Sequence, residues 1–138
     1  MDRKNKFFGF SLFELMITLV ILAILVAIAI PVYRNYVMRA RRSDGIQALL
    51  AIQIAEEKYR LSNSTYGTLV QVWSGSTSSE GYYSLSVSAV SASTYTITAS
   101  AIGNQANDTA DGVSCATLTL TYSNGTTAKS PSNCWQGH

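Results

Sequence analysis

Hydrophobic positions along this chain follow two different spacings. From Leu12 to Ile30 the residues are almost continuously apolar, and only Glu14 and Thr18 carry polar side chains. Nineteen residues in an α-helix rise about 28 Å, close to the hydrocarbon thickness of a bilayer. The pattern therefore predicts a helix able to span a membrane, with one ionisable carboxylate inside the apolar run.

The helical pattern continues beyond Pro31. The segment VYRNYVMRARRSDGIQALLAIQIAEEKYR contains a single glycine, Gly45, which weakens a helix by about 1 kcal/mol relative to alanine. We expect one helix from about Phe10 to about Arg60, roughly 75 Å long. Because proline lacks a backbone donor and crowds the preceding turn, a kink or weakened segment is expected at Pro31.

The C-terminal half of this predicted helix carries two apolar stripes, whereas a surface helix normally has one. We expect one stripe to pack on the protein's own sheet and the other on another molecule. The alternative is a helix buried on all sides within its own small domain. At 100° per residue the stripes are Ala48, Ile52, Ala55 and Tyr59 on one face, and Ile46, Leu50 and Ile54 on another.

Further along, apolar residues alternate with serines and threonines. The segments YYSLSVSAV, TYTITASA and CATLTLTY each have period two, which is typical of half-buried antiparallel strands. Asn124-Gly125 predicts a hairpin turn into a last short strand near 126–128. Residues 61–81 form a loop-rich connector that Val72 and Trp73 anchor to the core, and 103–112 a surface loop. The predicted fold class is α+β, a long N-terminal helix packed on a three- or four-stranded antiparallel sheet.

Charge divides the chain into unlike parts. The net charge of +2 is made of +2 in residues 1–9, +3 in 10–42 and −3 in 43–138. A mildly acidic C-terminal part is a poor candidate for a strong phosphate-binding surface. Four arginines follow the apolar run, and we expect them to contact acidic residues of neighbouring molecules or lipid headgroups, with nucleic acid as the alternative. They are Arg34, Arg39, Arg41 and Arg42.

Candidate catalytic and metal-binding groups are sparse. No His/Cys/Asp set or carboxylate pair has a spacing suited to catalysis, and the only histidine is His138, so we expect no enzyme and no cofactor. Asp108 and Asp111 flank a polar loop that could hold calcium, but their spacing lacks a full ligand set and an ordinary turn is the simpler interpretation. We therefore expect no metal.

The two cysteines, Cys115 and Cys134, both follow the apolar segment. Cysteines downstream of a membrane segment suggest export and a disulfide, and two unpaired buried thiols are the alternative. Closing a loop of this length would stabilise the fold by about 3 kcal/mol in the chain-entropy model. Charge counts on the two flanks of the span do not settle its orientation, but the cysteines favour a C-terminal part outside the cytoplasm.

The N-terminal residues together match the pattern of a known protein family. The stretch KFFGFSLFELMITLVILAILVAIAIPVYRNY resembles the class III signal and N-terminal helix of type IV pilins. The matching elements are the short basic leader, Gly9, Phe10, Glu14 four residues later, the apolar run and Pro31. The following loop, antiparallel sheet and C-terminal cysteine pair also look like a pilin head.

This resemblance implies a processing route. A prepilin peptidase would remove the leader, residues 1–9, by cutting between Gly9 and Phe10, and would N-methylate the new Phe10 amine. The subunit would wait in the inner membrane with its head in the periplasm. An assembly platform would then move it into an extracellular filament whose core is made of helices 10–42, below heads formed by 43–138.

The resemblance also suggests assembly roles for Glu14 and Pro31. The Glu14 carboxylate would pair with the Phe10 amine of its own or a neighbouring subunit, because a charge in a low-dielectric bundle is costly alone and tolerable when paired. The alternative is a carboxylate that simply reaches water at the headgroups. Partners are then other pilin subunits, the peptidase and the assembly platform.

Several functional classes remain open within this resemblance. We favour a minor subunit over a major one for a pilus used in adhesion, twitching motility or DNA uptake, because the chain is short and its C-terminal end resembles the small minor pilins. A type II secretion pseudopilin would usually lack the C-terminal disulfide. A DNA-binding receptor pilin would need a basic head, yet this one offers only Lys58, Arg60 and Lys129.

Overall fold

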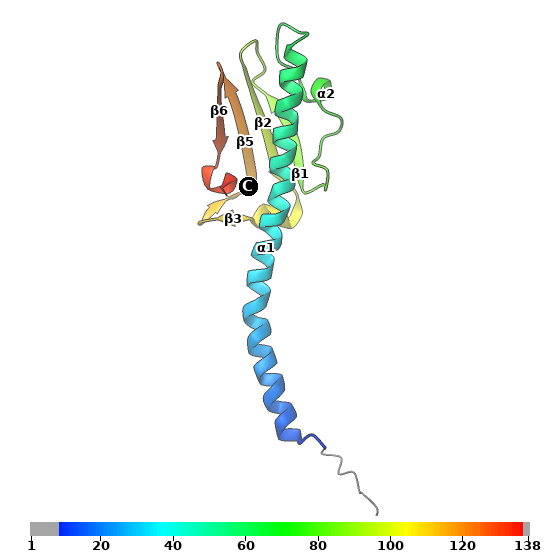
Figure 1. Ribbon diagram of the computed structural model, residues 1–138, viewed down its shortest axis with the longest axis vertical. Coiled ribbons are helices and arrows are strands. Elements are labelled where there is room, and N and C mark those ends of the chain that lie inside the picture. The colour runs from blue at the N-terminus through cyan, green and yellow to red at the C-terminus, as the bar shows by residue number, and fades with distance from the viewer. Residues whose placement is uncertain (1–8, 137–138) are drawn as a thin grey trace, which may run out of the picture. The chain divides into compact units, whose positions relative to one another are not determined.

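The computed structural model describes residues 9–136 (Figure 1), so the expected leader up to residue 8 and His138 lie outside the described residues. The chain divides into two compact units at the boundary between Tyr36 and Val37. We describe each unit by itself and call the second unit, from Val37 onward, the head.

Helix α1 (Leu12–Arg60) runs through both units without interruption, as the periodicity predicted. Its start has a local cause, since the Ser11 hydroxyl accepts a hydrogen bond from the Phe13 amide at 3.3 Å. Pro31 lies inside the helix and leaves the Ala27 carbonyl without its usual partner. The apolar window of α1 has a mean hydropathy of 3.1 and is long enough to cross a membrane.

In the head, a four-stranded antiparallel sheet has the order β1-β2-β5-β6. Its strands are β1 (Tyr83–Ser88), β2 (Thr94–Ala101), β5 (Thr117–Ser123) and β6 (Thr126–Ser130). The predicted hairpin joins β5 to β6, and Asn124 and Gly125 both have positive φ, as a two-residue turn requires. The predicted α+β class, helix and sheet are therefore confirmed.

The connections contain more structure than the sequence indicated. The 61–81 connector includes a short helix, α2 (Leu69–Val72), at whose start the Gln71 side chain accepts a hydrogen bond from the Thr68 amide at 2.7 Å. The region expected as a surface loop, 103–112, contains η1 (Gly103–Asn107) and β3 (Thr109–Ala110), and β3 pairs with β4 (Val113–Ser114). A last 3-10 helix, η2 (Ser132–Trp135), follows β6.

The head core lies between the head part of α1 and one face of the sheet, and Figure 1 shows the helix lying across that face. Leu49 and Ile52 are fully buried, while Ile54 is 60% exposed. The two-stripe prediction holds for Leu50, which is 36% exposed, but Ile46 is buried at 4% exposure. Ile46 was thus assigned to the wrong face. Val72 and Trp73 pack against this core, as expected.

Two further features tie the head together. Cys115 and Cys134 form the predicted disulfide, with an S–S distance of 2.04 Å, and both cysteines are fully buried. Gly45 is buried against Tyr83, because a Cβ built on the glycine would lie 2.8 Å from the Tyr83 ring carbon Cδ2. The helix therefore accepts a poor helix former where a larger residue would collide with β1.

Candidate assembly and binding surfaces

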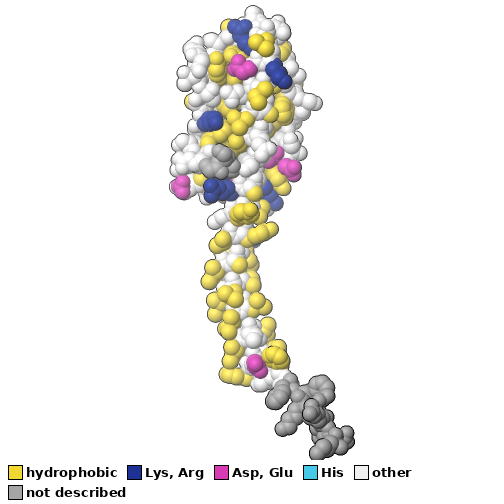
Figure 2. Space-filling view, viewed as in Figure 1, with side chains coloured by type: hydrophobic (Ala, Val, Ile, Leu, Met, Phe, Trp, Pro, Cys, Tyr) yellow, Lys and Arg dark blue, Asp and Glu magenta, His cyan; other side chains and the backbone are white. Residues whose placement is uncertain are grey.

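The first unit presents an uncovered apolar helix surface. Its large side chains are all substantially exposed, from Phe10 at 77% to Val26 at 44%. Exposed apolar surface on this scale marks a membrane segment or an interface rather than a soluble surface. Figure 2 shows this surface as predominantly yellow, and Glu14 is the only acidic residue between Gly9 and Tyr36.

The two polar side chains of this surface differ in how they are satisfied. The Thr18 hydroxyl donates to the Leu15 carbonyl at 2.8 Å, so its own helix provides its partner. Glu14 is exposed, and its side chain makes no hydrogen bond or ion pair with another of residues 9–136. Among residues 9–136 the Glu14 carboxylate is thus left without a protein partner.

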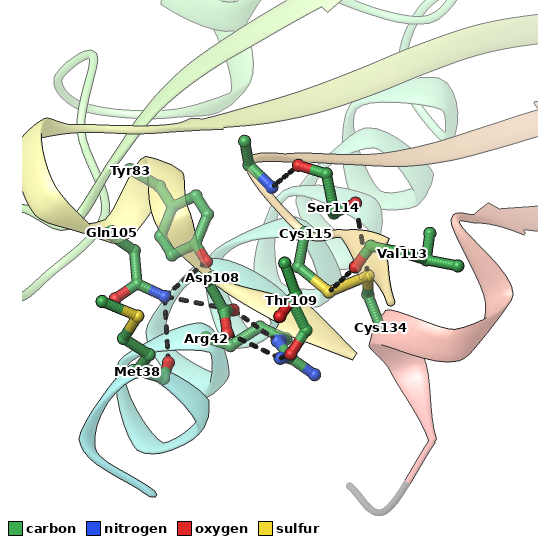
Figure 3. Close-up of polar contacts among 11 residues, drawn as sticks. Met38, Arg42, Tyr83, Gln105, Asp108, Thr109, Val113, Ser114, Cys115 and Cys134 are labelled. Atoms are coloured by element: carbon green, nitrogen blue, oxygen red, sulfur yellow. Dashed lines mark hydrogen bonds and ion pairs between the residues drawn. A yellow bond between two sulfur atoms is a disulfide. The ribbon is translucent and has the colours of Figure 1, made fainter. Parts of the chain in front are cut away.

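A buried ion pair fixes the first turns of the part of α1 that belongs to the head (Figure 3). The Arg42 guanidinium donates from Nε to Asp108 Oδ2 at 2.6 Å and from Nη2 to Asp108 Oδ1 at 2.7 Å. Nη2 also donates to the Thr109 carbonyl at 3.2 Å. Both charged side chains are at least 97% buried, with exposures of 3% and 2%. The hydrogen bonds to Asp108 raise the pKa of Arg42, so the guanidinium stays charged although it is buried.

Gln105 extends this network to the sheet and the helix backbone. Its amide nitrogen donates toward the Met38 carbonyl at 2.9 Å, the Tyr83 hydroxyl at 3.1 Å and Asp108 Oδ2 at 3.2 Å. Desolvation raises the pKa of Tyr83 to about 12, which keeps this phenol neutral. We call Arg42, Tyr83, Gln105 and Asp108 the neck clamp, because together they fasten the start of the head helix to η1 and β1.

The neck clamp corrects two sequence interpretations. Arg42 does not face a neighbouring molecule, since its charge is met within the chain by Asp108. Asp108 is not part of an ordinary exposed turn or of a calcium site, because both of its oxygens accept hydrogen bonds from Arg42. No group of three or more His, Cys, Asp or Glu residues suited to a metal occurs within residues 9–136.

The remaining cations of the head are spread out and mostly stacked on aromatic rings. The Arg41 guanidinium lies 4.6 Å from the centre of the Tyr82 ring, and the Lys129 ammonium 5.0 Å from that of Trp135. Arg60 donates to the Asn63 carbonyl at 2.7 Å. Figure 2 shows the dark blue Lys and Arg side chains scattered over the visible face of the head. The head thus offers single cations beside aromatic rings rather than one dense basic patch.

A buried carboxylate lies under the start of the α2 connector. Glu56 is fully buried, and its Oε2 accepts a hydrogen bond from the Gly67 amide at 2.7 Å, while Oε1 has no partner within the described chain. Desolvation raises the pKa of Glu56, and the Gly67 hydrogen bond opposes that rise. Sequence analysis missed this residue, because the run Glu56-Glu57-Lys58 reads as an ordinary solvent-facing turn of helix.

The sequence matches two known protein families. Residues 31–119 match the family described as "Type IV minor pilin ComP, DNA uptake sequence receptor". Residues 4–30 match the family described as "Prokaryotic N-terminal methylation motif". The first match covers most of the head, and the second covers the apolar run and the residues just before it.

Individual relatives are also fimbrial proteins. The chain is 35% identical over 86 residues to "Type IV major fimbrial protein FimA" of Dichelobacter nodosus, covering 62% of this chain and 55% of that protein. It is 38% identical over 68 residues to "Prepilin peptidase-dependent protein D" of Escherichia coli, covering 49% of this chain and 44% of that one. The chain spans about half the length of these curated relatives.

The structure and the two family matches agree. The chain has an exposed apolar helix, an antiparallel sheet packed on the continuation of that helix and a C-terminal disulfide. The chain therefore belongs to the type IV pilins, in the family of the minor pilin ComP.

Proposed function

We propose that this chain is a non-enzymatic minor pilin, a structural subunit of a type IV pilus. The family match over residues 31–119 is the observation that carries the proposal. The methylation-motif match over 4–30 supports removal of the leader between Gly9 and Phe10 and methylation of Phe10. The exposed apolar helix supports storage in the inner membrane, head in the periplasm, followed by packing against other pilin helices in the extracellular filament.

Glu14 is the residue assigned to assembly in this proposal. In the filament its carboxylate pairs with the methylated Phe10 amine of its own or a neighbouring subunit. A charge in a low-dielectric helix bundle is tolerated only when it is paired, so the pair selects one register between helices. Pro31 contributes by freeing the Ala27 carbonyl, which lets the helix adjust within the bundle.

Replacing Glu14 tests the assembly role. We expect the Glu14→Val subunit to be inserted and processed normally, yet to reach surface filaments at less than a tenth of the wild-type level. Immunoblots of membranes and of sheared filaments measure both quantities. Thr18→Val is the matched control, because it removes the other polar side chain of the apolar run, whose hydroxyl is already bonded to its own helix. Normal incorporation of Glu14→Val into filaments would refute the pairing.

Binding of DNA by the head is a second candidate function, favoured by the family description. The head has few cations available for DNA, because Asp108 neutralises Arg42 within the neck clamp, so we expect a modest affinity for DNA. Lys58, Arg60 and Lys129 are then the phosphate contacts, and the Trp135 ring beside Lys129 offers a surface for base or sugar contact.

Salt dependence tests DNA binding on the full chain in detergent. Affinity for a duplex should fall steeply as salt rises, and Lys129→Gln should reduce the slope of log K against log salt by about one, as expected for a lost phosphate contact. Lys129→Arg should keep the slope. An absence of binding at low salt would remove the DNA role and leave the pilin assignment intact.

A further inference from the structure

The sheet has a second face, opposite the head part of α1, with an unusual composition. Along each strand the side chains that point away from α1 alternate with the core residues. Thirteen of these fourteen outward positions are Ser or Thr, and Ala128 is the exception. We call this set the hydroxyl face: Ser84, Ser86, Ser88, Thr94, Thr96, Thr98, Ser100, Thr117, Thr119, Thr121, Ser123, Thr126 and Ser130.

Strand register arranges the hydroxyl face in rows. Ser86 pairs with Thr98, Thr98 with Thr119 and Thr119 with Ser130, so one row crosses all four strands. Neighbouring strands lie about 4.8 Å apart, which makes this row about 14 Å long. Successive rows along a strand are about 6.7 Å apart. The face is therefore a regular array of short polar groups.

About half of these hydroxyls, seven of the thirteen, have no hydrogen-bond partner among residues 9–136. Within residues 9–136, Ser86, Thr98 and Thr117 make no side-chain hydrogen bond, and Ser86 and Thr117 are exposed. The other six hydroxyls are already bonded, namely those of Ser84, Thr94, Thr96, Thr119, Thr121 and Ser123. Each free hydroxyl can donate one hydrogen bond and accept others. The array can therefore match a partner that offers both donors and acceptors.

Composition narrows the class of partner. None of the fourteen outward positions is charged, so the hydroxyl face has no counter-charge for a phosphate or carboxylate polymer. None is aromatic, so it offers no stacking platform for bases. A single hydrogen bond formed in competition with water contributes little, and only many simultaneous bonds hold a partner. The array thus fits an uncharged polymer that repeats hydroxyl or amide groups along its surface.

We propose that the hydroxyl face binds an uncharged polysaccharide. Its rows of hydroxyls bond the sugar hydroxyls, and the Thr methyl groups contact the C–H surfaces of the sugar rings. This proposal rests on the proposed function in one respect, since only a subunit displayed on a surface filament meets such a polymer. Lys129 points to the helix side of the sheet, as its pairing opposite the buried Leu120 shows, so the DNA candidate uses a different surface.

Binding to insoluble polysaccharides tests this inference. The full chain in detergent is mixed with suspensions of microcrystalline cellulose, chitin and, as a charged comparison, calcium alginate, and the unbound protein is measured. We expect binding to at least one neutral polymer that persists at high salt. The double variant Thr98→Val, Thr117→Val removes two unbonded hydroxyls while keeping side-chain shape, and should bind about tenfold more weakly.

The matched control is Thr127→Val, which removes a hydroxyl from the helix side of the same sheet. It should bind within twofold of wild type, and circular dichroism should show that all variants are folded. Equal binding by the double variant and the wild type would overturn the proposal. Binding to neither neutral polymer, or a preference for calcium alginate, would also overturn it. The assay needs no filament, so its failure is distinguishable from failure of the pilin role.

Discussion

At the scale of single residues, Arg42 shows how context decides the role of a charge. In the sequence it is one of four arginines after the apolar run, and in the fold its partner is Asp108, sixty-six residues away. Breaking a buried ion pair is costly, because one charge remains in a low-dielectric site. The pair therefore contributes to stability only while both partners are present.

Removing one partner of this pair should destabilise the head. We expect Asp108→Ala to lower the free energy of unfolding by about 3–5 kcal/mol, because it leaves the buried Arg42 charge without a partner. Denaturant unfolding of the full chain in detergent, followed by near-UV circular dichroism, measures the loss. Asp111→Asn is the control, an exposed carboxylate of the same loop, and should change stability by less than about 0.5 kcal/mol. The double variant Arg42→Met, Asp108→Leu should recover most of the loss.

Glu56 predicts a pH dependence. Its pKa in the folded head lies above the unfolded value, so folding favours the protonated form. The contribution of Glu56 is therefore fully present below the unfolded pKa of about 4.3 and is lost as the pH rises through the raised folded pKa. Glu56→Gln should melt at a higher temperature than wild type at pH 7 and at nearly the same temperature at pH 4.

At the scale of elements, the contact between α1 and β1 depends on an absent side chain. An added Cβ at Gly45 would lie 2.8 Å from Cδ2 and 3.0 Å from Cγ of the Tyr83 ring. Tyr83 is fully buried and its hydroxyl is bonded by Gln105, so the ring has little freedom to move aside. Close packing of helix on strand thus outweighs helix propensity at this position.

Replacing Gly45 with alanine should therefore change the free energy of unfolding in the direction opposite to that expected from helix propensity. Propensity alone makes Gly45→Ala stabilising by about 1 kcal/mol. We expect it instead to destabilise the head by about 1–3 kcal/mol, the usual cost of overpacking. Thermal melting of the full chain measures this. Gln47→Ala, at an exposed position of the same helix, should be neutral or slightly stabilising, and a stabilised Gly45→Ala protein would contradict the close contact.

At the scale of the whole molecule, periodic patterns carried the prediction. A 3.6-residue period located α1, a two-residue period located β1, β2 and β5, and Asn124-Gly125 located the turn before β6. These signals are local, because each comes from residues close together in the sequence. The neck clamp was not predictable in this way, because the Arg42–Asp108 pair depends on tertiary geometry. The short helix α2 and the buried Ile46 and Glu56 were missed for the same reason.

Processing gives a prediction for the intact subunit. Mass spectrometry of sheared surface filaments should find this chain beginning at Phe10 and carrying one added methyl group on that amine. Its abundance should be a small fraction of the main filament subunit, as expected of a minor pilin. A chain that retains residues 1–9 in filaments would exclude the proposed cleavage, and an abundance equal to the main subunit would exclude the minor role.

The position of the neck clamp has a mechanical consequence. Met38 and Arg42 belong to the first turns of the head helix, and both are bonded to the segment between β2 and β5. A pull applied along α1 from its N-terminal side therefore reaches the sheet at these turns first. Helix and sheet therefore share the tension where the head begins. The apolar contacts of Leu49 and Ile52, farther along the helix, are then not broken one after another.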